Sequence, residues 1–149
     1  MNPEMVYSVA GVALTEKFEG CKLTAYQDSG GVWTNGYGNT HGVVPGSTIT
    51  QEQAVADLRA NIQSSVNDIN QLVTVQLTQG EFDALVDFDF NLGRGNFAGS
   101  TLRTLINAGQ FQQAAAQFDR WDKCDGTVMA GLLRRRDAET GEFTGKVPA

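Results

Sequence analysis

The chain of 149 residues contains little of what cross-linked or metal-binding proteins are built from. It has two cysteines, Cys21 and Cys124, which are too few and too far apart in the sequence for a disulfide framework or a zinc site. Its only histidine is His41. We therefore expect no metal and no other cofactor. Cys21 is expected to be a small, partly buried side chain, while its place two residues after Glu19 leaves redox control of that region open.

Long apolar segments are also missing. No run approaches the roughly 18 uncharged apolar residues that a membrane-spanning helix needs. The first residues, Met1-Asn2-Pro3-Glu4, lack the basic region with which a signal peptide begins. There are no internal repeats or low-complexity segments, and the length suits one domain with a real core. The sequence therefore predicts a single domain over residues 1–149, made in the cytoplasm and not inserted into a membrane.

Basic side chains are scarce in the first part of the chain. Residues 1–90 carry three basic and eleven acidic side chains and residues 91–149 carry eight and six, so the net charge of −6 divides into −8 and +2. Phosphate binding needs a continuous basic patch, so nucleic acid is not expected as a partner. Residues 134–136 are all arginine. We expect them either to help bind the ligand locally or to pair with Asp137 and Glu139 at a helix end, with neither favoured.

Two acids and a hydroxyl stand out in residues 18–38, namely Glu19, Asp28 and Thr34. Cleavage of a glycosidic bond needs two carboxyl groups in different states. One is protonated and donates to the leaving oxygen. The other is ionised and activates water, acts as a nucleophile or offsets positive charge on the sugar ring. This spacing of residues is suited to that chemistry.

Glu19 is expected on the last turn of a helix. Apolar residues recur at helical spacing from about Glu4 to Phe18, and Gly20 is typical of a helix C-cap. The unpaired carbonyl groups of a last turn carry partial negative charge, which disfavours a carboxylate there. We therefore expect Glu19 to be partly buried and to act as the proton donor.

Asp28 and Thr34 are expected on a hairpin. Residues 23–26 predict a strand, residues 28–31 a turn, and residues 32–34 the returning strand. The turn glycines leave Asp28 near free backbone amides and water, so we expect it to stay ionised. A hydroxyl can donate to a carboxylate and accept from a water at once. Thr34 is therefore expected to hold a water against Asp28.

Each of these three residues also has an ordinary structural explanation. A glutamate at a helix end is usually solvated, an aspartate before Ser-Gly-Gly usually caps a turn, and a threonine in a strand is favoured by its β-propensity. The joint spacing favours function instead. Glutamate, eight residues, aspartate, five residues and threonine, followed by a glycine-rich strand, closely resembles the phage-type lysozymes, the muramidase endolysins of bacteriophages.

The resemblance continues in order over about residues 8–143. Residues 78–86 and 90–93, followed by residues 97–102, are similar to the central helix of the family and the helix after it. Residues 131–139 are similar to its closing basic helix. A match of this extent is far more specific than one short motif.

The expected fold class is α+β and mostly helical, a lysozyme-like domain of two lobes with a cleft between them. A small N-terminal β-hairpin lobe is expected over about residues 21–49, and a linking helix over about residues 50–70 with a capping box at its start, Thr50-Gln51-Glu52-Gln53. A helical lobe that includes the N-terminal helix is expected over about residues 71–143, where Thr78 begins a second capping box. Further helices are predicted near residues 100–108, 110–120 and 131–140.

Some positions depart from the family pattern. Asn39 stands where relatives commonly have histidine, and His41 follows two positions later. We expect His41 to be a loop residue, because the family mechanism requires no histidine. Asp87 and Asp89 place charge in a helix where relatives are often small or apolar. They can line the cleft, but solvated positions on the helix face are favoured, because aspartate is rarely fully buried.

The resemblance implies a muramidase that hydrolyses the β-1,4 bond between N-acetylmuramic acid and N-acetylglucosamine in bacterial peptidoglycan. It implies that Glu19 is the general acid, that Asp28 supports the attacking water and that Thr34 positions it. It also implies inversion, which requires the carboxyl groups to stand about 6.5–9.5 Å apart. The residues expected to bind substrate are Trp33, Tyr37, Gly38, Phe90 and Asn91.

The expected partner is peptidoglycan, acted on by a monomer that reaches the wall from the host cytoplasm with the help of a phage holin. A lytic transglycosylase is the enzymatic alternative, in which one acid acts and a hydroxyl of the sugar attacks. Asp28 and Thr34 favour hydrolysis, because only that reaction must hold a water. A second alternative is a catalytically inactive module that binds the cell wall.

Overall fold

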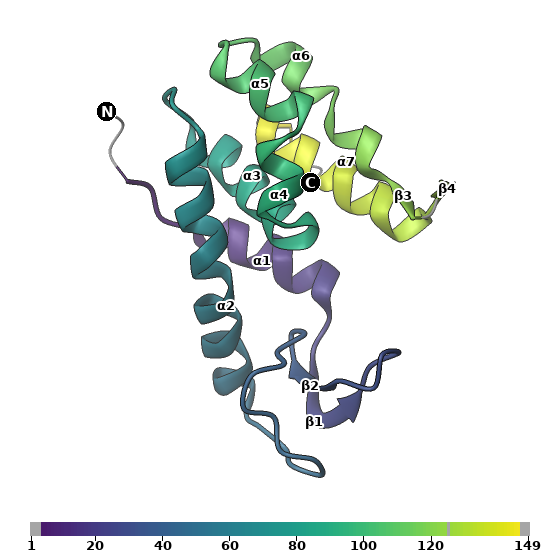
Figure 1. Cartoon of the computed structure of the whole chain (residues 1–149). Coiled ribbons are helices and arrows are strands. Elements are labelled where there is room, and N and C mark those ends of the chain that lie inside the picture. The colour runs from purple at the N-terminus through teal and green to yellow at the C-terminus, as the bar shows by residue number, and fades with distance from the viewer. Residues whose placement is uncertain (1–3, 125, 147–149) are drawn as a thin grey trace. The chain divides into compact units, whose positions relative to one another are not determined.

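The computed structural model describes residues 4–124 and 126–146, and the side chain of Cys124 lies outside the described part. This part is mostly helical, with a two-stranded antiparallel sheet near its N-terminal end, which confirms the predicted fold class (Figure 1). The elements in chain order are α1 (Val9–Glu19), β1 (Lys22–Gln27), β2 (Trp33–Gly36), α2 (Gln51–Leu72), α3 (Gln79–Leu92), α4 (Arg94–Ala98), α5 (Thr101–Asn107), α6 (Phe111–Ala115), the 3₁₀ helix η1 (Phe118–Trp121), β3 (Lys123–Cys124), β4 (Thr127–Val128) and α7 (Ala130–Thr144). In the described ranges no helix has the length and apolar character needed to cross a bilayer.

The chain divides into two compact units. We call Val12–Gln63 the hairpin unit, and Met1–Gly11 together with Ser64–Ala149 the helical unit. Helices α1 and α2 contribute residues to both units.

The hairpin unit contains the predicted β-hairpin. Strands β1 and β2 pair in antiparallel register with Tyr26 opposite Thr34, and a bulge lies between Lys22 and Tyr26. The other edge of β1 is covered by the loop before α2, through a bridge between Thr24 and Thr48. Both edges of β1 are therefore paired, so β1 is not an open edge strand.

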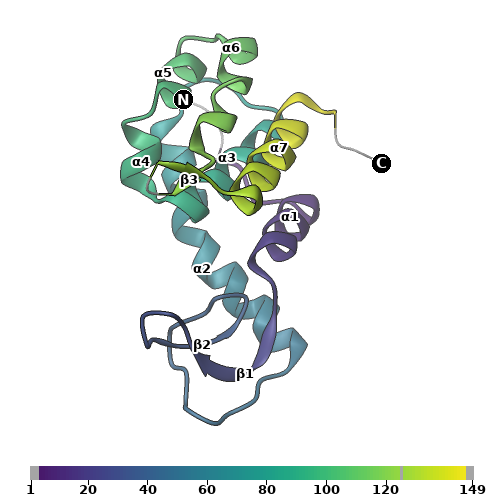
Figure 2. The same ribbon diagram turned by 90° about the vertical axis from the view of Figure 1, so that its right-hand side faces the viewer.

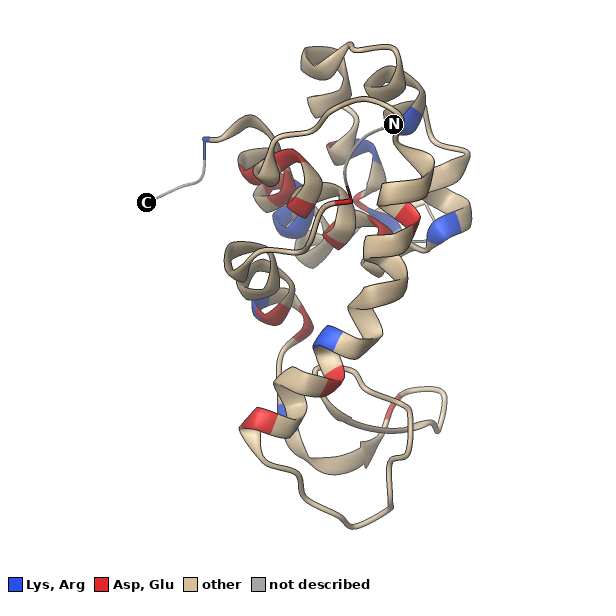
Figure 3. Cartoon of the chain, turned by 90° about the vertical axis from the view of Figure 1, so that its left-hand side faces the viewer, with Lys and Arg blue, Asp and Glu red and all other residues tan. Residues whose placement is uncertain are grey.

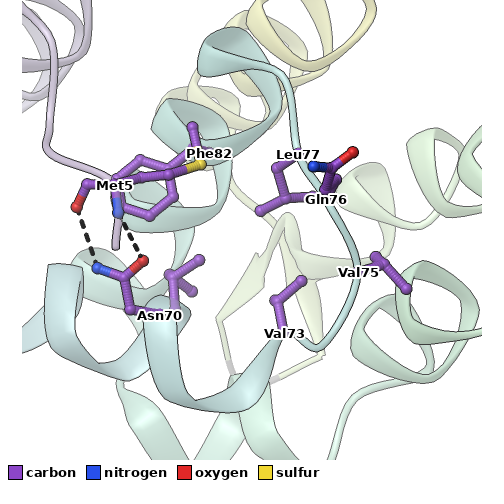
Figure 4. Close-up of a pocket in the computed structure, with 8 residues that line it drawn as sticks. Met5, Asn70, Val73, Val75, Gln76, Leu77 and Phe82 are labelled. Carbon is purple, nitrogen blue, oxygen red and sulfur yellow. Dashed lines mark hydrogen bonds between the residues drawn. The ribbon is translucent and has the colours of Figure 1, made fainter. Parts of the chain in front are cut away.

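Helix α1 begins later than its apolar periodicity predicts. The prediction placed the start near Glu4, whereas the helix begins at Val9. The Ser8 hydroxyl accepts a hydrogen bond from the N–H of Gly11 at 3.1 Å, as an N-cap does. The segment before it instead lies along the helical unit, where the Asn70 amide pairs with both the N–H and the carbonyl of Met5, each at 3.0 Å (Figure 4).

The two predicted capping boxes differ in the structure. At α3 the box is complete, because Thr78 and Glu81 each bond to the backbone of the other. At α2 only half of it forms: the Thr50 hydroxyl accepts from the N–H of Gln53 at 3.1 Å. The Gln53 side chain turns forward to Asp57 instead, at 2.8 Å. In a complete box the side-chain oxygen of Gln53 would instead accept a hydrogen bond from the N–H of Thr50.

The helical unit is centred on α3, which is buried at every position from Phe82 to Asp89. Figure 2 shows α7 beside α3, and these two helices are in contact. The Phe88 ring makes edge-on contacts with three aromatic rings, those of Phe97, Phe118 and Trp121. Such contacts stabilise a core beyond the apolar area that they bury.

The later helices broadly confirm the prediction, with shorter elements in places. The expected helix near residues 100–108 is α5, and the one near residues 131–140 is α7. The expected helix near residues 110–120 is divided into α6 and η1. The short helix α4 and the short pair of strands β3 and β4 were not predicted, because neither is long enough to show a hydrophobic period.

Candidate active site

Glu19 is the last residue of α1, as predicted. Gly20 follows with a φ of 68°, and its N–H donates to the carbonyl of Glu16 at 3.1 Å, so the helix ends there in the left-handed region that favours glycine. The Glu19 side chain is half-buried. The carboxyl group of Glu19 is therefore partly withdrawn from water.

Gly38 lies against the Glu19 carboxyl group. Its φ is 77°, and a Cβ added there would stand 3.3 Å from Oε1 of Glu19. Both the backbone conformation and the close approach favour glycine. The backbone of the segment after β2 therefore forms one wall beside the carboxyl group of Glu19.

Asp28 occupies the turn between β1 and β2. Its Oδ1 accepts hydrogen bonds from the N–H of Gly30 at 2.8 Å and from the N–H of Val32 at 2.9 Å. The Asp28 N–H in turn donates to the carbonyl of Val32 at 2.9 Å. These bonds fix the orientation of an exposed carboxylate on a tight turn, as the predicted amide-rich setting required.

Thr34 is buried on β2, and its hydroxyl makes a different hydrogen bond from the expected one. The prediction was a bond to the carboxylate of Asp28. In the structure the hydroxyl donates to the carbonyl of Val32 at 2.9 Å, which is the same residue whose N–H binds Asp28. The hydroxyl therefore donates its one hydrogen bond to Val32, and its oxygen can still accept a hydrogen bond from a water.

The residues expected to bind substrate fall into both units. Trp33 is half-buried on β2 opposite Gln27, and Gly38 is exposed. Tyr37 is buried, and its hydroxyl accepts a hydrogen bond from Gln51 at 2.8 Å. In the helical unit, α3 carries the other two residues, Phe90 and Asn91, both half-buried. The side-chain oxygen of Asn91 accepts a hydrogen bond from Nη2 of Arg136 at 2.8 Å.

Asn39 and His41 lie in the loop after β2. The Asn39 side chain is buried and donates to the side-chain oxygen of Asn35 at 3.1 Å and to the carbonyl of His41 at 3.0 Å. His41 itself is exposed. Asn39 therefore orders the loop, and His41 is the loop residue that the sequence predicted.

Cys21 is a free, exposed cysteine, so the expectation of a partly buried side chain was wrong. Its thiol donates to Oε1 of Gln51 at 3.6 Å, across the surface of the hairpin unit. In the described part of the chain, no three side chains of the kind that bind metals come close enough together to hold an ion.

The preference for solvated positions at Asp87 and Asp89 was wrong, because both side chains are buried. Asp87 is fully buried and receives two hydrogen bonds from the guanidinium of Arg135, at 2.9 and 2.8 Å. Asp89 is 2% exposed and lies beside Asp68 of α2. The favoured interpretation failed because the partners of both aspartates lie far away in the sequence.

Two of the three consecutive arginines are part of the interior of the helical unit. Arg135 and Arg136 are buried, and Arg136 forms an ion pair with Glu139 at 2.8 Å. Burial raises the pKa of Glu139 well above its ordinary value, and the nearby charge of Asp87 raises it further. Arg134 alone is exposed. The pairing alternative is confirmed for Arg136 and Glu139. Arg135 is also paired, but with Asp87 in place of the expected Asp137 or Glu139.

Basic and acidic residues follow one another along α7, which carries Arg134, Arg135 and Arg136 and then Asp137, Glu139 and Glu142 (Figure 3). Helix α3 carries acidic residues and no basic one.

Two pockets lie in the helical unit. One, of about 330 Å³, is lined mainly by apolar side chains, among them Met5, Val73, Leu77 and Phe82 (Figure 4). The other, of about 270 Å³, is open and lined by Thr101, Gln117, Arg120 and Trp121. Its lining combines the Trp121 ring with three polar side chains. The sequence analysis did not identify this second pocket.

The chain matches known proteins over most of its length. Residues 16–139 match the family model described as phage lysozyme. An endolysin of Acyrthosiphon pisum secondary endosymbiont phage 1 is 41% identical, with 93% of this chain and 98% of that protein covered.

Solved structures agree with this match. An endolysin from Escherichia coli O157:H7 phage FAHEc1 is 33% identical, with a TM-score of 0.91 and 100% of both chains covered. The muramidase domain of SpmX from Asticaccaulis excentricus is 39% identical, with a TM-score of 0.86 and 93% of this chain and 97% of that chain covered. The chain therefore belongs to the phage lysozyme family, whose members lyse the bacterial cell wall.

Proposed function

We propose that the protein is a muramidase, which hydrolyses the β-1,4 glycosidic bond between N-acetylmuramic acid and N-acetylglucosamine in peptidoglycan. The observation that carries this proposal is the contrast between the two acids of the hairpin unit. Glu19 is half-buried at a helix end against Gly38, whereas Asp28 is exposed and oriented by two backbone amides. Inverting and retaining glycosidases both need two carboxyl groups in different settings.

In this mechanism Glu19 donates its proton to the leaving glycosidic oxygen. Asp28 accepts a proton from the attacking water or stabilises positive charge on the sugar ring. Thr34 accepts a hydrogen bond from that water, because its own hydroxyl proton is donated to the carbonyl of Val32. General acid–base catalysis of this kind contributes roughly 10²–10⁴-fold to the rate for each group.

Substrate binding is proposed for residues of both units. Trp33 and Gly38 contribute from the hairpin unit, and Phe90 and Asn91 from α3. The hydrogen bond from Arg136 holds the amide of Asn91 in one orientation, so its N–H groups are directed consistently.

The biological setting proposed is lysis of a bacterial host by a phage. The protein would be made in the host cytoplasm and act as a monomer on the wall after the membrane is opened, with a holin as its functional partner. The endolysin names of its relatives support this setting. The muramidase name of one structural neighbour supports the bond proposed.

Two other functions compete with this proposal. A lytic transglycosylase uses one acid and holds no attacking water, so it needs neither an ionised Asp28 nor a hydroxyl acceptor at Thr34. An inactive module that binds the wall gives no reason for the close fit of Gly38 to Glu19.

Mass spectrometry of fragments released from purified peptidoglycan separates the three. Reducing muramic acid ends are expected for hydrolysis. Anhydro ends would establish a transglycosylase, and binding to the wall without released fragments would establish a binding module.

A further inference from the structure

Asn39 uses the whole hydrogen-bonding capacity of its side chain inside the hairpin unit. The side chain is 5% exposed. Its two amide N–H groups donate to Oδ1 of Asn35 at 3.1 Å and to the carbonyl of His41 at 3.0 Å. Its Oδ1 accepts from the N–H of His41 at 3.3 Å and from Nδ2 of Asn61 at 3.1 Å. A buried amide with all its partners stabilises one arrangement of the segments that it joins.

The bonds between Asn35 and Asn39 close a short turn. We call the three residues between them, Gly36, Tyr37 and Gly38, the glycine turn. The N–H of Asn35 donates to the carbonyl of Asn39 at 2.9 Å, and the N–H of Asn39 donates to the carbonyl of Asn35 at 2.8 Å. Glycine has the least restricted backbone of all residues, so a turn with two of them depends on the bonds at its ends for its shape.

Helix α2 supports the glycine turn at both ends, through residues that also belong to the hairpin unit. Gly36 packs directly on the helix, because a Cβ added there would stand 3.3 Å from the Cβ of Ala54. Asn39, directly after the turn, is held by the bond from Asn61. Both supporting residues lie in the interior of a helix of 22 residues, which is a rigid base for the turn.

The last residue of the glycine turn lies next to the proposed acid. A Cβ added at Gly38 would stand 3.3 Å from Oε1 of Glu19. One planar peptide bond joins Gly38 to Asn39, so bonds that fix Asn39 also limit where the Gly38 backbone lies. The side chain of Asn39 therefore helps to fix the wall beside the Glu19 carboxyl group.

We infer that Asn39 is a positioning residue for the general acid, whose side chain holds the glycine turn on α2 so that the Glu19 carboxyl group keeps one orientation against Gly38. The inference rests on the proposed role of Glu19. It gives the buried amide a part in the reaction besides the ordering of its own loop.

The physical need for such a residue follows from where Glu19 is. The last turn of a helix has carbonyl groups without helical partners and opens more easily than the middle of the helix. A glutamate side chain also has several rotatable bonds, whereas proton donation requires hydrogen-bond reach to one oxygen. A displacement of about 1 Å at such a group can cost on the order of 10²-fold in rate.

The substitution Asn39→Ala tests the inference, because it removes all four side-chain hydrogen bonds. We expect kcat for release of reducing ends from peptidoglycan to fall roughly 10-fold with KM little changed, since orientation of the acid matters in the transition state. Tm should fall as well, because the substitution leaves buried partners without their bonds.

Asn107→Ala is the matched control for loss of stability. Asn107 is a half-buried asparagine of the helical unit, and its side chain also binds backbone groups. Its Oδ1 accepts from the N–H of Thr74 at 2.9 Å, and its Nδ2 donates to the carbonyl of Leu72 at 2.9 Å. This variant should lower Tm and retain the wild-type kcat, assayed below the Tm of both variants.

Asn61→Ala is a milder second variant, which serves if Asn39→Ala does not fold. It removes the support of Asn39 by α2 and leaves the bonds of Asn39 to Asn35 and His41 in place. We expect its kcat to fall by a smaller factor than that of Asn39→Ala. Combining the two substitutions should lower kcat no further than Asn39→Ala alone, because the bond between the two residues is already lost.

The outcomes distinguish this inference from the proposed function. Wild-type kcat in Asn39→Ala and Asn61→Ala, or an equal fall of kcat in Asn39→Ala and Asn107→Ala, would overturn the inference. Glu19→Gln is assayed alongside them, and if it retained activity, the general-acid proposal itself would fail. Loss of activity in Glu19→Gln with full activity in Asn39→Ala would leave the muramidase proposal standing without the positioning role.

Discussion

Asp89 of α3 is buried beside Asp68 of α2 in the helical unit. Burial raises the pKa of Asp89 to about 7, and the neighbouring carboxyl group of Asp68 raises it further. Ser65 and Arg94 oppose the rise, and Arg94 forms an ion pair with Asp68 at 2.6 Å. Oδ1 of Asp89 has no hydrogen-bond partner in the described part. Asp89 therefore keeps its proton to a higher pH than an exposed aspartate does.

The pair predicts that stability falls as the pH rises toward neutrality. The pKa of Asp89 is raised from 3.8 to about 7, so the folded state binds more protons than the unfolded state across this interval. The stabilisation is complete below pH 4 and is lost as the pH approaches and passes 7. Thermal unfolding from pH 4 to pH 8 should show Tm decreasing over this range through the contribution of Asp89.

Asp89→Asn checks this prediction, because an amide can donate to Asp68 at every pH. We expect its Tm at pH 8 to exceed that of the wild type, with each kcal/mol appearing as roughly 2–4 °C for a chain of this size. A smaller slope should remain below pH 6, because burial and Asp137 raise the pKa of Asp119 to about 6. A variant with the same slope as the wild type up to pH 8 would show that Asp89 does not carry the effect.

Asp87→Asn, in contrast to Asp89→Asn, is expected to destabilise the folded protein. Its carboxylate receives two hydrogen bonds from Arg135, and both side chains are almost fully buried. Removal of one charge leaves the other buried without its partner, which typically costs on the order of 3–5 kcal/mol. Urea unfolding at pH 5 and pH 8 should show a large loss at both values. A loss under 1 kcal/mol would mean that water reaches the guanidinium.

Gly38→Ala is expected to abolish most activity. The substitution places a methyl group 3.3 Å from Oε1 of Glu19 at a φ of 77°. Gly42→Ala is a control with the same backbone cost, because its φ is 67° and a Cβ there meets nothing within 4 Å. Both should lose on the order of 1 kcal/mol of stability. Equal activities in the two variants would show that contact with Glu19 is unimportant.

Asp28→Asn is expected to lower activity while the fold is retained. The amide oxygen of asparagine can still accept from Gly30 and Val32, so the turn should remain closed. The missing charge should lower kcat by roughly 10²-fold or more. The measurement compares kcat with Tm, and a parallel loss of both would assign Asp28 to the structure of the turn alone.

The features that the sequence predicted correctly are those with local causes. The end of α1 follows from Gly20, and the hairpin around Asp28 follows from its turn residues. The box at Thr78 likewise lies within four residues. Each of these elements is determined by residues close together in the chain, so the sequence is sufficient to predict it.

Several of the features that it missed depend on partners far apart in the sequence. Asp87 is separated from Arg135 by 48 residues, so nothing near Asp87 indicates that its charge is paired. The backbone of Met5 is bound by Asn70, 65 residues away, which holds the N-terminal segment outside the helix.

The central claim is that Glu19 is the general acid of a hydrolase, and the most direct test is release of reducing ends from purified peptidoglycan by Glu19→Gln. Glu52→Gln, an exposed glutamate on α2, is the matched control. We predict that Glu19→Gln keeps the wild-type Tm and loses at least roughly 10²-fold in rate, while Glu52→Gln retains full activity. A folded Glu19→Gln protein that releases reducing ends at the rate of Glu52→Gln would contradict the proposed mechanism.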